Sequence, residues 1–336
     1  MSSPIVPSDS RPIIAFTPGD PAGIGPEILV AGWAELCRTC RPLVVAGTQV
    51  ISRAVSVRDP IAFRTVNDPA EALGHPNQMD ILEGTKVDLA GLSWGKIDPR
   101  GGAVARDCLH KAIDLALARS VGAIVTGPLH KESLRLAGET HPGHTEILAE
   151  RCGVSDHAMV LATSEVAVLH ATLHMALRDI FSRLTPEHLV SQAALLSGLL
   201  ERLGKGKPRI ALPGLNPHAG DGGLFGNEES TILAEAVKMA RDKGIDLTGP
   251  ISPDNVFIRA FDGEFDGILA LYHDQGHIPL KLVGRRRCVN ITAGLPIVRT
   301  SVAHGTAFDI AGKGIAKPDS LFEATAWAVR LARNPV

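Results

Sequence analysis

Short apolar runs alternate with amphipathic stretches along the whole chain. The apolar runs predict strands at residues 13–16, 42–46, 123–125, 166–169, 210–212 and 267–272. The stretches between them place apolar residues on one face, at the period of a helix. They predict helices at residues 26–38, 104–119, 145–152, 185–203, 227–243 and 320–333. Alternation of this kind favours an α/β fold in which helices cover both faces of a largely parallel sheet.

One segment has the spacing of a zinc-protease helix. Residues 271–281 read LYHDQGHIPLK, with His273 and His277 four positions apart. Gly276 is costly inside a helix, and Pro279 disfavours helical geometry at the residue before it. We therefore expect no helix here. His273 is instead expected just beyond the carboxyl end of a strand, which is where ligands bind in open α/β sheets.

Three histidines share this relation to the predicted strands. His174, His218 and His273 each follow an apolar run by a few residues. Strand ends at one edge of a sheet can converge, and three imidazoles with an open coordination position suit a divalent metal ion. A lone histidine is more often an ordinary surface or core group, so the spacing alone leaves both interpretations open.

Positive side chains gather around Asn290. Lys281, Arg299 and the triplet RRR at 285–287 lie within a short span of it. Lysine and arginine beside polar side chains suit a phosphate or carboxylate ligand. We interpret the triplet as a solvated loop. We do not extend that interpretation to Lys281 or Arg299, because these two border apolar or turn-rich stretches.

Composition limits the partners of the chain. Its 336 residues suffice for about two domains, and a hydrophobic content of 45% supports a sizeable core. A net charge of −2 and an aromatic content of 4% argue against nucleic acid or an anionic membrane as a partner. No signal segment and no apolar stretch of about 18 residues is present, so we expect neither export nor a membrane span.

Two local motifs do not meet the requirements of cofactor signatures. Cys37 and Cys40 form a C-x-x-C that does not open a helix and has no second pair. We therefore expect reduced structural cysteines in a cytoplasmic protein. The loop GDPAGIGPE has Ile28 where the dinucleotide fingerprint G-x-G-x-x-G requires glycine. The helix start after Pro26 can still bind an anion.

Several long motifs carry a family resemblance: TPGDPAGIGPE, GPLHKESL, PGHTEILA, LNPHAGDGGLFGNEE, SPDNVF, YHDQGHIPLK and NITAGLPIVRTSVAHGTAFDIAGKG. From about residue 13 to 332 the chain resembles the 4-hydroxythreonine-4-phosphate dehydrogenase family. The resemblance implies an isocitrate/isopropylmalate dehydrogenase-like α/β/α subunit with two lobes around a cleft, in a homodimer with shared active sites. We expect residues 1–130 and 300–336 to form the nucleotide-side lobe. Residues 131–299 would form the lobe for metal, substrate and dimerisation.

The resemblance also implies roles for individual residues. The implied metal ligands are His174, His218 and His273, the last supplied by the neighbouring subunit, whereas His277 is not a ligand. The implied substrate contacts are His144, Thr145, Lys281, Asn290 and Arg299. Lys281, Asp254 or solvent would accept the proton. Residues 304–318 resemble the adenosine-binding loop of isocitrate and isopropylmalate dehydrogenases, which implies cofactor contacts at His304, Gly305, Thr306, Asp309 and Gly312.

The activity implied is the metal-dependent oxidation of 4-hydroxythreonine 4-phosphate in pyridoxine biosynthesis. NAD or NADP would accept the hydride, and one zinc, magnesium or cobalt ion would polarise the alcohol. The 3-keto acid formed can decarboxylate to 3-amino-2-oxopropyl phosphate. The variants PGHTE and HDQGHIPLKL resemble a second branch that acts on D-threonate or D-erythronate 4-phosphate in sugar-acid breakdown. A phosphate acyltransferase-like enzyme and a non-catalytic small-molecule binder are the alternatives from other classes.

Overall fold

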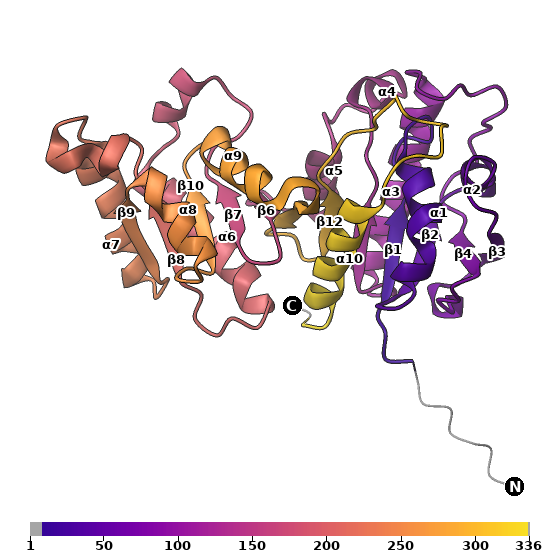
Figure 1. Ribbon diagram of the computed structural model, residues 1–336, viewed down its shortest axis with the longest axis horizontal. Helices are drawn as coiled ribbons and strands as arrows, with labels where there is room; N and C mark the ends of the chain where they lie inside the picture. The colour runs from indigo at the N-terminus through magenta and orange to yellow at the C-terminus, as the bar shows by residue number, and fades with distance from the viewer. Residues whose placement is uncertain (1–8, 335–336) are drawn as a thin grey trace, which may run out of the picture. The chain divides into compact units, whose positions relative to one another are not determined.

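The computed structural model describes residues 9–334, which form two compact units (Figure 1). Unit 1 comprises residues 9–139 and 306–318, and unit 2 comprises residues 140–305 and 319–334. The C-terminal helix therefore belongs to unit 2, whereas we expected it in the first lobe. It packs on a strand of unit 2, where Thr300 Oγ1 donates to the carbonyl of Ala324 over 2.8 Å. The roles expected of the two lobes stay predictions.

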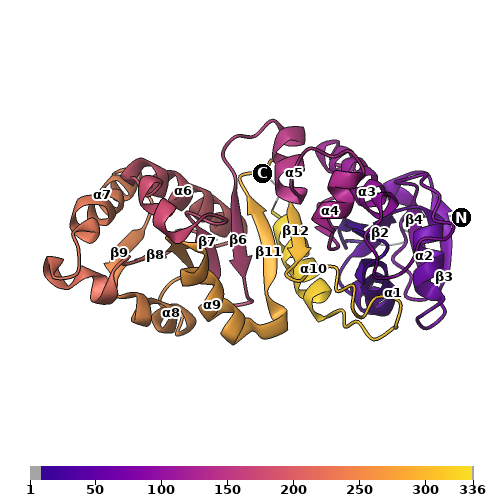
Figure 2. The ribbon, with the colours of Figure 1, turned by 90° about the horizontal axis from the view of Figure 1, so that it is seen from above.

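Unit 1 contains a five-stranded parallel sheet in the order β3-β4-β2-β1-β5. Its strands are β1 (Ile13–Thr17), β2 (Arg41–Val45), β3 (Ala62–Val66), β4 (Gln78–Leu82) and β5 (Ala123–Thr126). Its helices are α1 (Gly25–Leu36), α2 (Thr48–Val55), η1 (Pro69–Glu71), α3 (Pro99–Leu117) and α4 (Lys131–Leu136). Helices α1 and α3 lie on opposite faces of this sheet, as Figure 2 shows.

Unit 2 contains seven strands in the order β12-β11-β6-β7-β10-β8-β9. They are β6 (Ala158–Ala162), β7 (Ala167–His170), β8 (Ile210–Pro213), β9 (Leu247–Ile251), β10 (Gly267–Ala270), β11 (Val289–Ala293) and β12 (Arg299–Val302). Strands β7, β10, β8 and β9 are parallel, whereas the pairs β6–β7, β6–β11 and β11–β12 are antiparallel. The predicted α/β fold is confirmed, with the parallel strands interrupted by this antiparallel segment.

The helices of unit 2 cover both faces of its sheet (Figure 2). They are α5 (His144–Cys152), α6 (Pro186–Arg202), α7 (Ala234–Asp242), α8 (Pro253–Phe261), α9 (His273–Gly284) and α10 (Asp319–Ala332). Shorter turns are η2 (Leu177–Ser182), η3 (Pro217–Gly223), η4 (Glu229–Leu233) and η5 (Arg285–Arg287). Within residues 9–334, no helix is long and apolar enough to cross a membrane.

Helix α9 contradicts the expectation that residues 273–281 would not be helical. It includes Pro279, and Gly276 is among its buried residues. A Cβ at Gly276 would lie 2.4 Å from His170 Nε2 and 2.8 Å from Val168 Cγ1, so glycine permits this close approach to β7. The helix also buries Leu280 in the core cluster beneath it. This packing outweighs the poor helical propensities of glycine and proline.

Replacing Gly276 with alanine is expected to destabilise the protein, although alanine favours helices. Overpacking against β7 costs about 1–3 kcal/mol, which exceeds the gain of roughly 1 kcal/mol in helix propensity. Gly198 of α6 is the matched control, because a Cβ there meets no atom within 4 Å. Urea unfolding should show a lower free energy of unfolding for Gly276→Ala and an unchanged or higher one for Gly198→Ala. A stabilised Gly276→Ala protein would contradict this account of α9.

Candidate active site

Three neighbouring strands present the predicted histidines at one edge of the unit 2 sheet. His174 follows β7, His218 follows β8 and His273 follows β10. Strand β10 pairs in parallel with both β7 and β8, so the three carboxyl ends lie side by side. The rings of His174 and His273 have centroids 5.9 Å apart. Within the single chain, residues 9–334 bring no three His, Cys, Asp or Glu side chains close enough to hold a metal ion.

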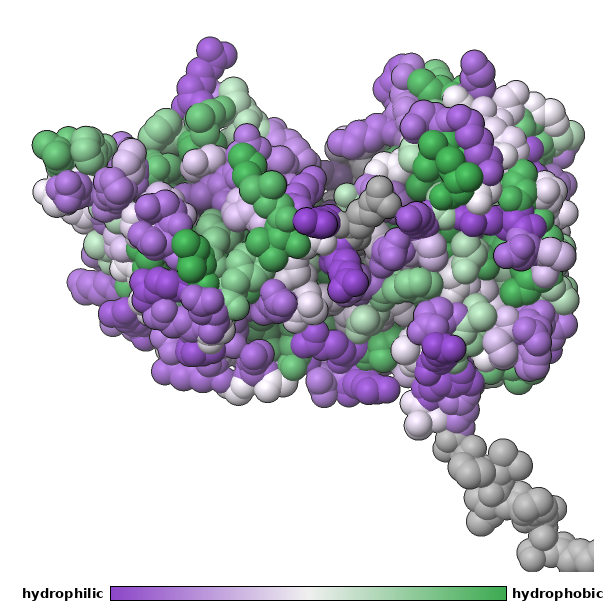
Figure 3. Space-filling model, viewed as in Figure 1, coloured by the Kyte–Doolittle hydropathy of each residue, from purple (hydrophilic) through white to green (hydrophobic). Residues whose placement is uncertain are grey.

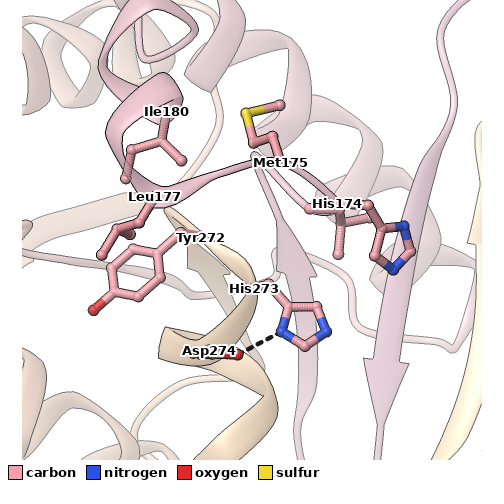
Figure 4. A pocket seen from close by; sticks show the side chains of 8 residues that line it. His174, Met175, Leu177, Ile180, Tyr272, His273 and Asp274 are labelled. Atoms are coloured by element: carbon pink, nitrogen blue, oxygen red, sulfur yellow. Dashed lines mark hydrogen bonds and ion pairs between the residues drawn. The ribbon is translucent and has the colours of Figure 1, made fainter.

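His273 is oriented by the acidic residue beside it (Figure 4). Asp274 Oδ1 lies 2.6 Å from His273 Nδ1, which leaves Nε2 as the nitrogen available to a ligand. A carboxylate on the second nitrogen is the usual partner of a metal-binding histidine. Both residues line a pocket of about 520 Å³, together with His174 and the apolar side chains of Leu177 and Ile180. The pocket therefore places imidazoles beside an apolar wall.

Two further imidazoles support His273 from the side of the sheet. His277 stacks on His273 with ring centroids 3.8 Å apart, and its Nδ1 lies 3.0 Å from Nε2 of the buried His170. Burial and neighbouring imidazoles lower the pKa of His170 to about 3 and that of His277 to about 4. Both rings are therefore neutral at physiological pH. Sequence reasoning missed His170, because its only signal was a polar residue ending the apolar run AVLH.

Two of the predicted substrate contacts lie on one face of the sheet. Val168 faces α9, and the ladder pairs it with Leu161, which is opposite Asn290. Residues directly opposite in a ladder point to the same face, so Asn290 also lies on the α9 side. Arg299 lies on that face too, opposite Thr292, to which its Nη1 donates over 3.2 Å. These contacts come from strands β11 and β12, which sequence reasoning had missed.

Arg299 provides a buried positive charge on this face. Only 3% of the residue is exposed, and burial lowers its pKa to about 10. Arg299 and burial together hold the pKa of His144 well below its usual range, with burial the larger cause. His144 Nε2 and Asn290 Oδ1 are buried without a hydrogen-bond partner among residues 9–334. Together, these groups offer a cation, a hydrogen-bond acceptor and a ring nitrogen to a small polar ligand.

The remaining substrate and proton-transfer candidates are more exposed. Thr145 is half-buried in the first turn of α5, next to His144. Lys281 is exposed on α9. We had not expected it to be a solvated residue, and its exposure corrects that expectation. Asp254 lies in the first turn of α8, where a hydrogen bond from Ser252 Oγ lowers the pKa of its carboxyl. Asp254 is therefore ionised at neutral pH and can accept a proton, but it is a weak base.

The predicted cofactor loop is held by the glycine loop after β1. Glu27 is fully buried, and its two carboxylate oxygens accept the backbone N–H groups of Gly312 (2.6 Å) and Gly314 (3.1 Å). Ile24 N donates to the carbonyl of Thr306 over 3.0 Å. Two anchors in unit 1 thus fix the backbone of residues 306–314. Glu27 was not predicted, and its only signal was an acid at the start of α1.

The other members of this loop have distinct surroundings. Phe308 stacks on His130 with ring centroids 4.9 Å apart. His304 Nδ1 lies 2.9 Å from the carbonyl oxygen of Gly305, and Asp309 is exposed. The two cysteines of the C-x-x-C are buried free thiols, and burial raises the pKa of Cys37 to about 11 and that of Cys40 to about 12.

Comparison with known proteins identifies the class. The chain is 45% identical over 322 residues to D-threonate 4-phosphate dehydrogenase of Salmonella typhimurium strain LT2, covering 95% of this chain and 98% of that protein. It is 41% identical over 325 residues to 4-hydroxythreonine-4-phosphate dehydrogenase of Desulfosudis oleivorans, covering 95% and 96%. The crystal structure of 4-hydroxythreonine-4-phosphate dehydrogenase from Klebsiella pneumoniae matches with a TM-score of 0.90 at 42% identity, over 97% of this chain and 99% of that one.

The chain is thus an enzyme, a dehydrogenase that acts on a CH–OH group. Residues 38–328 match the family described as Pyridoxal phosphate biosynthetic protein PdxA, and the chain belongs to that family. The family predicted from the loop motifs is confirmed. The oxidoreductase is favoured over the acyltransferase and the non-catalytic binder.

The buried His170 is expected to make stability depend on pH. Its pKa is lowered from 6.5 to about 3 in the folded chain, so only the unfolded chain is protonated between these values. Stability is therefore present above pH 6.5 and is lost as the pH falls below it. Between pH 7 and 5 this one group removes about 2 kcal/mol from the free energy of unfolding. Urea unfolding of His170→Gln should show a fall smaller by roughly that amount, and an equal fall would contradict the assignment.

Proposed function

We propose that this enzyme oxidises the secondary alcohol of a four-carbon acid 4-phosphate, with NAD or NADP as hydride acceptor. D-threonate 4-phosphate is the first candidate substrate, because the relatives named for it are up to 45% identical. 4-Hydroxythreonine 4-phosphate is the second, with relatives up to 41% identical. The two differ by an amine in place of a hydroxyl at carbon 2. In both, oxidation at carbon 3 gives a β-keto acid that can lose carbon dioxide.

The observation that carries the proposal is the buried Arg299 beside unpartnered polar atoms. Arg299 donates to Thr292 and interacts with the carboxylate of Glu146, and its guanidinium keeps a permanent positive charge at this buried position. Arg299 can donate charge-assisted hydrogen bonds to a phosphate, as can His144 Nε2 when it carries the ring proton, whereas the unpartnered Asn290 Oδ1 is an acceptor that suits a substrate hydroxyl. Arginine matches phosphate geometry through its planar fork of donors. Lys281 and Thr145 are the further candidates for this subsite.

The histidines at the strand ends fit a divalent metal ion. His174, His218 and His273 supply imidazole nitrogens, which suit zinc and cobalt better than magnesium. Asp274 holds the Nδ1 of His273 and so directs its Nε2 outward, as a ligand requires. When bound, a divalent ion acts as a Lewis acid that makes the substrate alcohol easier to deprotonate. The neutral pair His170 and His277 keeps the base of the site free of added positive charge.

The cofactor and proton roles are assigned by position. His304, Gly305, Thr306, Asp309 and Gly312 would contact the adenosine part of the cofactor. Glu27 would act through the backbone of Gly312, because it fixes that loop before the cofactor binds. Asp254 and Lys281 are alternative acceptors for the alcohol proton, together with solvent. A general base is selected by its distance from the proton as well as by its pKa.

An apolar surface on α8 and α9 supports a homodimer with shared sites. Figure 3 shows hydrophobic residues gathered over these two helices. Ile258, Leu282 and Val283 expose 60%, 73% and 55% of their surfaces around a pocket of about 730 Å³. Exposed apolar patches of this kind mark protein–protein contacts. His273 is the first residue of α9, so a partner docked on this helix would also lie near a candidate ligand.

Phosphate recognition is expected to dominate substrate choice. Two lost charge-assisted bonds of about 1.5–3 kcal/mol each would reduce kcat/KM on the order of a hundredfold or more. The measurement compares kcat/KM for D-threonate, D-erythronate and 4-hydroxythreonine with and without the 4-phosphate, using NAD and NADP. Equal values within each pair would reject phosphate recognition, and the best phosphate identifies the branch.

A matched pair of variants tests which cation serves the phosphate. Arg299→Gln should lose most of the preference for phosphorylated substrates. Arg287→Gln removes the same charge from an exposed turn and should keep that preference. A similar loss in both variants would point to the overall charge of the region instead of a subsite at Arg299.

Subunit mixing tests the shared site. His174→Ala and His273→Ala should each be inactive alone, because each removes one expected metal ligand from every site. In a mixed dimer one of the two sites regains all three histidines, so part of the activity should return. Mixing two preparations of His174→Ala is the control and should give no recovery. If confirmed subunit exchange restores no activity, the ligands come from one chain.

A further inference from the structure

The turn that carries His218 has an unusual handedness. His218, Ala219, Gly220, Asp221 and Gly222 have φ values of 53°, 56°, 81°, 44° and 68°, so five successive residues are left-handed. Three of the five are not glycine. An L-residue in this region brings its Cβ close to the following carbonyl oxygen, and such residues normally occur singly. A run of this kind is therefore unfavourable alone and requires support from its surroundings.

Glu229 provides that support from the next element of the chain. It belongs to η4, a π-helical turn, and is 7% exposed. Its Oε1 accepts the backbone N–H groups of Leu215 (2.9 Å) and Asn216 (2.7 Å), and its Oε2 accepts Asn216 Nδ2 (3.0 Å). These three bonds hold the backbone that leads into the left-handed run. π-Helical turns inside helices are frequent at functional sites.

The turn also closes around the carboxylate from the other side. A Cβ at Gly220 would lie 2.7 Å from Glu229 Oε2, so the backbone there lies directly against the acid. Burial raises the pKa of Glu229, but the hydrogen bonds from Asn216 and Leu215 outweigh burial and lower it overall. The carboxylate is therefore ionised at neutral pH. One buried acceptor contacts the turn both before and after His218.

We propose that Glu229 is a positioning residue for His218, holding the left-handed turn in the one conformation that presents this imidazole to a divalent metal ion. The inference rests on the proposed function only in taking His218 as a metal ligand. Glu229 acts through the backbone and touches neither the substrate nor the ion. Outer-shell residues that orient metal ligands typically change metal affinity by about 10–100-fold.

Cobalt binding by the metal-stripped protein tests the role without relying on turnover. Glu229→Ala should raise the cobalt dissociation constant at least about tenfold, measured from the visible absorption of the bound ion. Glu229→Gln should raise the dissociation constant less than Glu229→Ala does, because its amide oxygen can still accept the N–H groups of Leu215 and Asn216, while Asn216 Nδ2 keeps its bond to Glu228. Glu235→Ala is the matched control, since it removes an acid exposed on the following turn of the same helical segment.

The outcomes separate this inference from the proposed function. If the wild-type protein binds cobalt and Glu229→Ala binds it equally well, the positioning role is overturned, even when the melting temperature falls. If the wild-type protein binds no cobalt, both the metal site and the positioning role are overturned. Should Glu229→Ala not fold, Gly220→Ala places a methyl group against Oε2 with the charge intact. Unchanged cobalt affinity in that folded variant would equally overturn the role.

Discussion

The parallel pairing of β7, β10 and β8 is the constraint on which the candidate site depends. Parallel strands direct their carboxyl ends to one edge, so the segments after them must turn within a narrow strip of the surface. His174, His218 and His273 lie in those three segments. The sheet fixes where each segment begins, and the local contacts of each segment then decide how its imidazole points.

Those local contacts repeatedly use a buried carboxylate as an acceptor for backbone amides. Glu27 holds the loop at Gly312 in unit 1, and Glu229 holds the turn before His218 in unit 2. A carboxylate can accept several N–H groups at once, which suits it to irregular backbone that has no ladder or helix to satisfy it. Glu27 precedes its loop in the sequence, and Glu229 follows its turn. Neither acid is among the residues expected to contact a ligand.

The sequence predicted the elements whose signals are local. The strands at 13–16, 123–125 and 210–212 and the helix capped by Thr185 appear where their patterns placed them, with Thr185 Oγ1 accepting His188 N over 3.2 Å. The histidines were located after strands for the same reason. Strands β11 and β12 were missed because they mix polar residues that face a site with apolar ones. Helix α9 was mispredicted because the fit of Gly276 against His170 exists only in the folded chain.

The resemblance supplied what spacing could not, since it matched whole loops. It did not assign a role to Glu229, Glu27 or His170. The contacts of these three residues are with partners that lie 13, 285 and 107 positions away in the sequence, respectively. Such contacts depend on how the chain returns to itself. Neither periodicity nor short motifs can predict them. The residues expected to bind ligands could therefore be predicted from the sequence, whereas the residues that hold them in place could not.

Helix α9 has a consequence that extends beyond the single chain. Its first residue is His273, its inner side buries Leu280, and its outer side exposes Ile278 and Leu282. Under the proposed assembly, helix α9 would supply His273 to the active site of the neighbouring subunit and would also form part of the contact between the two subunits. Specific activity would then depend on enzyme concentration. Dilution would dissociate the dimer and inactivate the enzyme without any small-molecule effector.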